Sequence, residues 1–277
     1  MIPIRIRQFP SFLKSTIKRE KVLLKPAVVS KTFILCFFSC HSYFRYLYCS
    51  LHSLTRHIKS VQYKVFIFND EDQPISVAQI SVIQKLLPEV RVITWPKSMG
   101  WGSKQIGSIW DAYGLASHEA KDDDVIARVD SDVFFFNDTI FKAVSQSDAD
   151  LVGDGHFVDF KYCQGGCYFF KVEAVRKINK MISSDGINTL LKGIDVVVED
   201  VAAYNFAKKL GLKIWLTWFM MFPDELKNAG SLTPWYRWKF SCLHFIMKNK
   251  IAMLDAYERE ILKGNSSTPY RQALDTE

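Results

Sequence analysis

The sequence predicts an α/β fold with a mainly parallel sheet and helices on both of its faces. Three observations support this prediction. Short apolar runs, typical of strands buried on both faces, alternate with segments of helical periodicity. The composition is that of a globular chain, because 48% of the 277 residues are hydrophobic and 23% are charged. Acidic residues follow two of the apolar runs, and ligands of parallel sheets bind where the strands end.

Residues 1–31 differ from the rest of the chain in charge. They hold eight Lys and Arg against one acid, whereas residues 32–277 hold 28 charged residues of each sign. We interpret this segment either as a solvated, partly disordered leader or as a segment that contacts an anionic membrane surface. The neutral remainder of the chain argues against nucleic acid as a partner. No apolar segment directly follows the basic residues, so we do not expect a secretory signal.

From residue 32 onward, three strand–helix units and a fourth strand follow one another. The expected strands are continuous apolar runs, which are Thr32–Ser39, Tyr63–Phe68, Val90–Thr94 and Val125–Val129. The expected helices are Tyr43–Ile58, Pro74–Leu87 and a segment that leads from the Gly-rich stretch at residue 100 to about Ala120. Because such helices connect parallel neighbours, this order predicts a Rossmann-like sheet.

These observations divide the chain into three regions. The basic leader spans residues 1–31, the main domain spans 32–250, and a C-terminal helix with a polar tail spans 251–277. No apolar run reaches the roughly 18 residues that a membrane-spanning helix needs. The six cysteines are too sparse for a disulfide scaffold, and those near residues 36–57 lack a CxxC zinc motif, so we expect reduced thiols in a reducing cytosol.

Two aspartates close the fourth strand. Asp130 and Asp132 are two residues apart, so strand alternation points both side chains to the same side. Neighbouring carboxylates repel each other and are costly to bury, and a divalent cation removes that cost. Oxygen ligands of this kind suit Mn²⁺ or Mg²⁺. The alternative is a solvated Asp-Ser-Asp turn, which the apolar runs on both sides disfavour.

The segment Asp130-Ser131-Asp132 resembles the D-x-D motif of GT-A fold glycosyltransferases, which use nucleotide-diphosphate sugars. The resemblance covers roughly residues 32–248 and predicts the GT-A fold for them. It implies that Asp132 binds the metal ion directly and that Asp130 contacts the metal ion or the ribose of the nucleotide.

Two later segments resemble the inverting family 2 of these enzymes. Gly165 and Gly166 precede a strand, as in the acceptor loop that follows the D-x-D motif. Glu199 and Asp200 open an amphipathic helix, as in the x-E-D helix of that family. The resemblance therefore implies Asp200 as the general base and Glu199 beside it as part of the catalytic site. From the residues alone, acids in a first helical turn are also explained by the helix dipole.

Four further residues complete the predicted site. By the same resemblance, His244 closes the metal shell and Lys248 neutralises the diphosphate. Asp70, after the second strand, is expected to bind the base or ribose, and Lys104 is expected to contact the nucleotide or its phosphates. A structural role for His244 and a loop-capping role for Asp70 are the alternatives.

The sequence also departs from family 2. Its first strand ends without a Pro/Asn-rich loop, and it carries neither C-terminal membrane helices nor a Q-x-x-R-W motif, which argues against a polymer-extruding synthase. One alternative is a retaining transferase of family 8, because His244 and Lys248 are similar to that family's C-terminal motif, although its Gly and Pro-Trp are missing. A nucleotide-sugar pyrophosphorylase and a non-catalytic nucleotide-sugar-binding module are the others.

The resemblance thus implies a metal-dependent transfer of one sugar, with inversion, to an acceptor hydroxyl in glycan or polysaccharide biosynthesis. The expected partners are a UDP- or GDP-sugar and a glycan or lipid-linked acceptor. We expect a cytoplasmic protein, with its basic leader on the inner face of the membrane where it contacts lipid.

Overall fold

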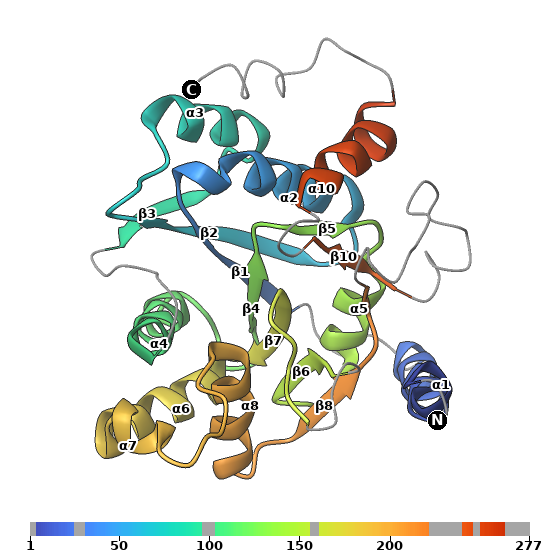
Figure 1. The fold of residues 1–277 in the computed structure, drawn as a ribbon, viewed down its shortest axis with the longest axis vertical. Helices are drawn as coiled ribbons and strands as arrows, with labels where there is room; N and C mark the ends of the chain where they lie inside the picture. The colour runs from blue at the N-terminus through green and yellow to red at the C-terminus, as the bar shows by residue number, and fades with distance from the viewer. Residues whose placement is uncertain are drawn as a thin grey trace.

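The computed structural model describes residues 4–24, 31–95, 103–155, 161–221, 240–245 and 250–263, leaving out the side chains of residues 4–9, 11, 12 and 103. A seven-stranded sheet has the order β3-β2-β1-β4-β7-β6-β8, and a small sheet has the order β5-β10-β9 (Figure 1). The strands are β1 (Thr32–Ser39), β2 (Gln62–Asp70), β3 (Arg91–Trp95), β4 (Val125–Asp130), β5 (Val133–Phe135), β6 (Leu151–Asp154), β7 (Cys167–Lys171), β8 (Ile214–Thr217), β9 (Met220–Met221) and β10 (Cys242–His244).

The helices lie between these strands, as the alternation of patterns predicts. They are α1 (Ile4–Leu23), α2 (Phe44–His57), α3 (Val77–Leu86), α4 (Ser103–Ser117), α5 (Thr139–Gln146), α6 (Val172–Asp185), α7 (Ile187–Leu191), α8 (Glu199–Lys209) and α10 (Lys250–Tyr257), with short turns η1 (His41–Tyr43) and η4 (Glu258–Leu262). Helix α3 begins after the expected Pro74, because the side chain of Ser76 caps it and Gln79 completes a capping box.

The parallel half of the sheet confirms the predicted α/β fold. β1 pairs in parallel with β2 and β4, and β2 pairs in parallel with β3. The expectation of parallel strands holds for these four and not for the whole sheet. β7 runs antiparallel to both β4 and β6. Just before β7, the Gly166 carbonyl accepts a hydrogen bond from the backbone N–H of Asp130, which holds the start of β7 beside the end of β4.

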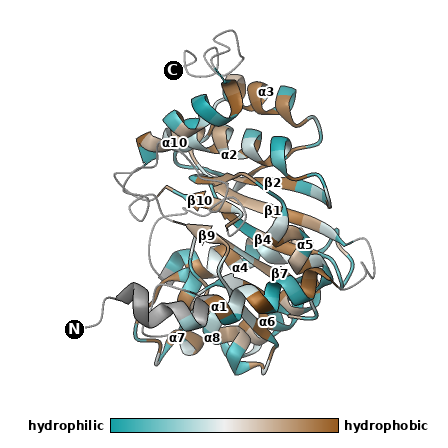
Figure 2. Ribbon diagram, turned by 90° about the vertical axis from the view of Figure 1, so that its right-hand side faces the viewer, coloured by the Kyte–Doolittle hydropathy of each residue, from teal (hydrophilic) through white to brown (hydrophobic). Residues whose placement is uncertain are grey.

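The sheet separates two apolar layers, and alternate residues of β1 enter each. Phe33, Leu35 and Phe37 pack with α2, α5 and α10, whereas Ile34 and Cys36 pack with α4, α6 and α8. Figure 2 shows the largely apolar strands lying between helices that carry both hydrophobic and hydrophilic residues. This burial on both faces explains why the strands are continuous apolar runs.

Helix α1 lies within the region expected as a leader and packs against the end of β8. The hydroxyl groups of Ser15 and Thr217 are 2.7 Å apart, and the Arg19 guanidinium donates to the Trp218 carbonyl over 3.0 Å. Arg19 is fully buried, whereas Leu13 and Ile17 are exposed. Part of the basic segment is therefore an ordered helix. The division of the chain into three regions stays a prediction.

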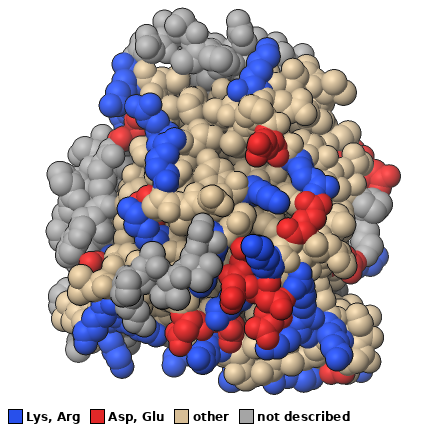
Figure 3. Space-filling view, turned by 180° about the vertical axis from the view of Figure 1, so that it is seen from behind, with Lys and Arg blue, Asp and Glu red and all other residues tan. Residues whose placement is uncertain are grey.

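The surface of the main body mixes charges of both signs. In the view from behind, Asp and Glu side chains gather in the lower part of the face with Lys and Arg around them (Figure 3). Ion pairs such as Lys177–Glu173 and Lys213–Asp148 account for part of this mixture. Among the described helices, none is both long and apolar enough to span a bilayer.

Candidate metal and sugar-transfer site

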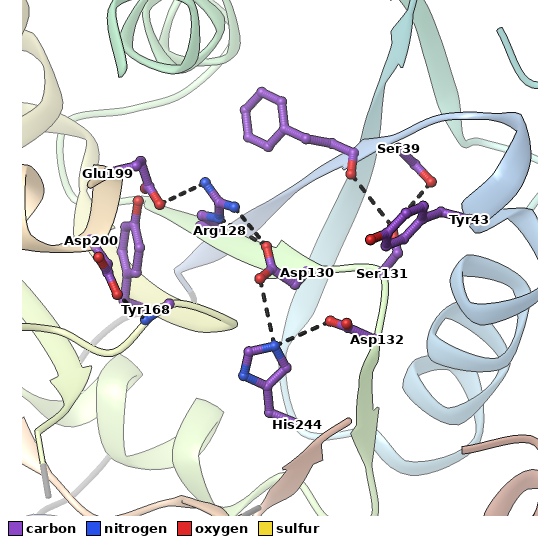
Figure 4. A network of polar contacts seen from close by, with 12 residues as sticks. Ser39, Tyr43, Arg128, Asp130, Ser131, Asp132, Tyr168, Glu199, Asp200 and His244 are labelled. Carbon is purple, nitrogen blue, oxygen red and sulfur yellow. Dashed lines mark hydrogen bonds and ion pairs between the residues drawn. The ribbon is translucent and has the colours of Figure 1, made fainter. Parts of the chain in front are cut away.

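Charged side chains occupy every second position at the end of β4 and in the turn that follows it. Arg128, Asp130 and Asp132 are each two residues apart, so they lie on one side of the chain. The turn is tied to the end of β1, because the Ser131 hydroxyl lies 3.1 Å from the Ser39 hydroxyl (Figure 4). Both strands end here, so the carboxylates stand at the carboxyl edge of the parallel strands, as predicted.

The small sheet brings His244 to this edge from far along the chain. β10 pairs antiparallel with β5, which places His244 opposite Val133, and the N–H of Phe245 donates to the Asp132 carbonyl over 2.9 Å. The imidazole Nε2 lies 3.2 Å from Asp132 Oδ1 and 3.6 Å from Asp130 Oδ2 (Figure 4). The structure thus brings Asp130, Asp132 and His244 together, and their role as metal ligands stays a prediction.

The donor set fits a divalent cation. One ligand atom each from Asp130, Asp132 and His244 lies within 4.8 Å of the other two, and both Asp132 and His244 are buried. Two carboxylates and a neutral imidazole suit Mn²⁺ or Mg²⁺. Burial by itself would raise the pKa of Asp130, but attraction to Arg128 and His244 lowers it below its usual value, so this carboxylate is ionised at neutral pH.

Two glycines make room for this arrangement. Gly166 has φ of +100°, and a Cβ atom there would lie 2.5 Å from His244 Nδ1. A Cβ atom on Gly165 would lie 3.1 Å from Asp200 Oδ2. The backbone of this loop thus approaches both the metal-side and the helix-side residues closely, which is the role expected of the Gly-Gly pair.

Helix α8 presents Glu199 and Asp200 at its first turn. The N–H of Gly165 donates to Asp200 Oδ2 over 2.8 Å, and Val201 N–H donates to the other oxygen. Burial raises the pKa of Asp200 above its usual value, although both hydrogen bonds oppose the change. A carboxylate with a raised pKa is suited to accept a proton.

Sequence reasoning missed Arg128, which joins the two halves of the site. Its Nη2 and Nε donate to Asp130 Oδ1 over 2.7 and 3.1 Å, and its Nη1 lies 2.7 Å from Glu199 Oε2. Burial disfavours the charged guanidinium, but attraction to Asp130 and Glu199 raises its pKa well above the usual value. A charged residue inside the otherwise apolar run Val125–Val129 was the available signal.

The two partners of Arg128 differ in protonation. Burial raises the pKa of Glu199 to about 8, and neighbouring Asp200 adds to this effect, while Arg128 opposes it. The short ion-pair distance alone would favour an ionised Glu199. The Asp130 carboxylate already compensates the charge of Arg128. We therefore consider burial the effect that decides the pKa of Glu199.

Lys250 is a second residue that sequence reasoning missed. Its Nζ lies 3.4 Å from Asp132 Oδ2, donates to the Tyr43 hydroxyl and stands 3.9 Å from the centre of that ring. The expected Lys248 lies outside the described residues. A second lysine six residues after His244 was the signal, but its position depends on how α10 packs against α2.

The remaining predicted residues stand at the same edge or on α4. One carboxylate oxygen of Asp70 accepts from the backbone N–H groups of Asp72 and Gln73, so it orders the turn after β2. Lys104 is exposed at the start of α4. Nucleotide binding by either stays a prediction. The six cysteines are free thiols, as expected.

Known structures share this fold. The galactosyltransferase LgtC, solved with donor and acceptor sugar analogs, matches with a TM-score of 0.54 and 13% identity over 82% of this chain and 96% of LgtC. An active-site mutant of LgtC matches with a TM-score of 0.55 and 12% identity over 85% of this chain and 96% of that one. The bifunctional glycosyltransferase WbbM matches with a TM-score of 0.58 and 12% identity over 92% of this chain and 53% of WbbM.

At this identity the similarity concerns the fold alone, and it confirms the GT-A fold that the sequence predicts. No protein-family model matches the sequence, and no curated protein matches it either. The acidic pair and the histidine lie at the edge of the sheet where such a fold binds its ligands.

Proposed function

We propose that this protein is a metal-dependent glycosyltransferase that moves a sugar from a nucleotide-diphosphate donor to an acceptor hydroxyl. The observation that carries the proposal is the cluster of Asp130, Asp132 and His244 at the carboxyl edge of a glycosyltransferase fold. A UDP- or GDP-sugar and a glycan or lipid-linked acceptor are the proposed partners, in glycan or polysaccharide biosynthesis.

The chain's own residues suit the donor half of this reaction. Asp130 Oδ2, Asp132 Oδ1 and His244 Nε2 would hold Mn²⁺ or Mg²⁺. When bound, the cation supplies Lewis-acid stabilisation of the departing nucleoside diphosphate. The Lys250 ammonium, next to Asp132, adds positive charge for the phosphates. Asp70 and Lys104 are proposed to contact the nucleoside.

Asp200 suits the acceptor half. Its raised pKa and its place beside Gly165 support the role of a base that takes the proton of the acceptor hydroxyl. A single displacement with this base would invert the anomeric centre. Retention is the second candidate outcome, because His244 and Lys248 are similar to the C-terminal motif of family 8, and a second lysine, Lys250, stands with His244 at Asp132.

A membrane surface is the proposed further partner of helix α1. Two exposed apolar side chains on this helix and a third directly after its end alternate with three exposed lysines, and these are Leu13, Ile17, Leu24, Lys14, Lys18 and Lys21. Apolar and basic side chains on one exposed helix face match the chemistry of an anionic bilayer. This contact would hold the enzyme near a lipid-linked acceptor.

The test is calorimetric titration of UDP-, GDP-, ADP- and CMP-sugars, with and without Mn²⁺, on the wild type and on Asp132→Ala. We expect one donor to bind only with Mn²⁺ and only to the wild type. Metal-independent binding or no binding would contradict the proposal. Once a donor is known, the anomeric configuration of the product by proton NMR separates inversion from retention.

A further inference from the structure

Arg128 forms a bridge between a metal-side carboxylate and the helix that carries the proposed base. It lies on the central strand β4, with only 11% of its side chain exposed. One edge of the guanidinium makes two hydrogen bonds to Asp130, and the remaining nitrogen reaches Glu199 at the start of α8 (Figure 4). A planar guanidinium held at both ends has little freedom to rotate.

The bridge selects which oxygen of Asp130 faces the cation site. Both Arg128 donors use Oδ1, so Oδ2 is left toward His244 Nε2 at 3.6 Å. Residues behind a ligand fix its orientation in this way, and their loss lowers metal affinity about 10- to 100-fold. Glu199 is in turn the group that fixes Arg128 from the other side, through Oε2.

We propose that Glu199 is a positioning residue for the cation site, which acts through Arg128 on Asp130, and that it does not transfer a proton. The inference rests on the proposed function because it assumes that Asp130 binds the cation. It reassigns Glu199 from the catalytic role that the sequence resemblance implies. Its neighbour Asp200, which faces Gly165, keeps the proposed role of base.

The first turn of α8 contributes to both halves of the proposed site. Glu199 holds the donor side through Arg128, and Asp200 faces the loop at Gly165. A shift of α8 therefore changes both the orientation of the proposed metal ligand Asp130 and the position of the proposed base Asp200. Loss of the Glu199 side chain should then weaken cation binding even without any sugar present.

The experiment measures binding of Mn²⁺ alone by electron paramagnetic resonance of the free ion. Glu199→Ala and Arg128→Lys should weaken affinity about 10- to 100-fold, because alanine leaves nothing in contact with Arg128 Nη1 and an ammonium cannot reach both Asp130 and Glu199. Glu199→Gln should stay within about threefold of the wild type, because its amide oxygen can accept from Arg128 Nη1. Matched controls are Glu173→Ala and Arg176→Lys on α6, a helix-start glutamate and an arginine in exposed ion pairs, which should bind as the wild type does.

Two readouts decide the outcome. If Glu199→Ala and Glu199→Gln both keep wild-type Mn²⁺ affinity, the inference is overturned, and equal loss of turnover in both would assign Glu199 to proton transfer. If the wild type itself binds no Mn²⁺, the proposed metal site fails and the inference falls with it. Should Glu199→Ala not fold, the double variant Arg128→Met/Glu199→Leu, which replaces both buried polar side chains by apolar ones, should fold and still lose affinity, and full affinity there would also overturn the proposal.

Discussion

Gly166 occupies a position where any side chain would collide with the proposed metal ligand His244. Its φ of +100° is a conformation that L-residues avoid, and its built Cβ lies 2.5 Å from the imidazole. The glycine is therefore required twice, once by the backbone and once by the close approach of β10. Few other positions in the described residues combine both demands.

Gly166→Ala should weaken metal binding with a modest loss of stability. Gly193→Ala is the matched control, because Gly193 also has a positive φ, of +84°, but a Cβ atom there would meet nothing within 4 Å. Both variants should lose about 1–2 kcal/mol of folding free energy from the backbone. We expect Mn²⁺ affinity to fall at least about tenfold in Gly166→Ala alone. Equal affinity in the two variants would show that His244 is not a ligand.

Asp200→Asn should separate donor binding from chemistry. The amide oxygen can still accept the Gly165 N–H, so the loop keeps its place. Turnover should fall at least about 100-fold because the proton acceptor is lost, while the donor affinity measured by calorimetry stays near that of the wild type. A variant with normal turnover would exclude Asp200 as the base.

At the scale of secondary-structure elements, α1 carries the exposed face described above. Lys18 also stands 5.3 Å from the centre of the Trp215 ring, so this lysine has a second role at the body of the protein. Lys14 and Lys21 are the better probes of surface contact, because each is exposed.

Lys14→Gln/Lys21→Gln and Leu13→Gln/Ile17→Gln should weaken binding to anionic vesicles. Each lysine near such a surface contributes about 1 kcal/mol, so the first pair should lower the partition coefficient roughly 10-fold or more at low salt. The measurement is cosedimentation with phosphatidylglycerol-containing vesicles, and neutral phosphatidylcholine vesicles are the reference. Lys180→Gln/Lys192→Gln and Val77→Gln/Leu115→Gln are matched controls on other exposed surfaces. Equal binding by all variants would remove α1 as the contact.

Most elements could be predicted because burial leaves a local signature. β1 is a continuous apolar run, and it was predicted with the bounds that it has, Thr32–Ser39. The direction of β7 could not be predicted, because periodicity reports burial and carries no information on strand direction. The three-stranded sheet was missed for a similar reason, since β9 and β10 are only two and three residues long.

The same limit explains which site residues were predicted. Asp130 and Asp132 are local neighbours in sequence, so alternation alone places them together. Arg128 was missed although it follows the same alternation. Its role depends on its contact with Glu199, which lies on α8 and is distant in sequence. Lys250 begins α10, which packs against α2, so its contact with Asp132 depends on tertiary packing that no local pattern encodes.

At the scale of the whole molecule, the buried charges make stability depend on pH. Burial raises the pKa of Glu199 from 4.5 to about 8, so the folded metal-free protein binds a proton that the unfolded chain has already lost at neutral pH. This contribution is complete below about pH 4.5 and is lost as pH rises through about 8. Stability from this group therefore decreases between these values.

The melting temperature of the metal-free protein should accordingly fall from pH 5 to pH 8 and then level, as far as Glu199 determines it. Glu199→Gln removes the titrating group and should show a flatter profile across the same window. Scanning calorimetry in a chelator, at several pH values and constant ionic strength, measures the difference between the two proteins. Parallel profiles would show that Glu199 keeps an ordinary pKa in the folded state.

Because β10 pairs with β5 and carries His244, the protein can bind a cation only late in its synthesis. The parallel strands β1 to β4 are complete by residue 130, yet the third ligand arrives only with residue 244. During synthesis from the N-terminus, the nascent chain could assemble these four parallel strands well before it could hold a cation. Once held, the ion would join residue 132 to residue 244 and restrict the long chain between them, as a crosslink restricts an unfolded polymer.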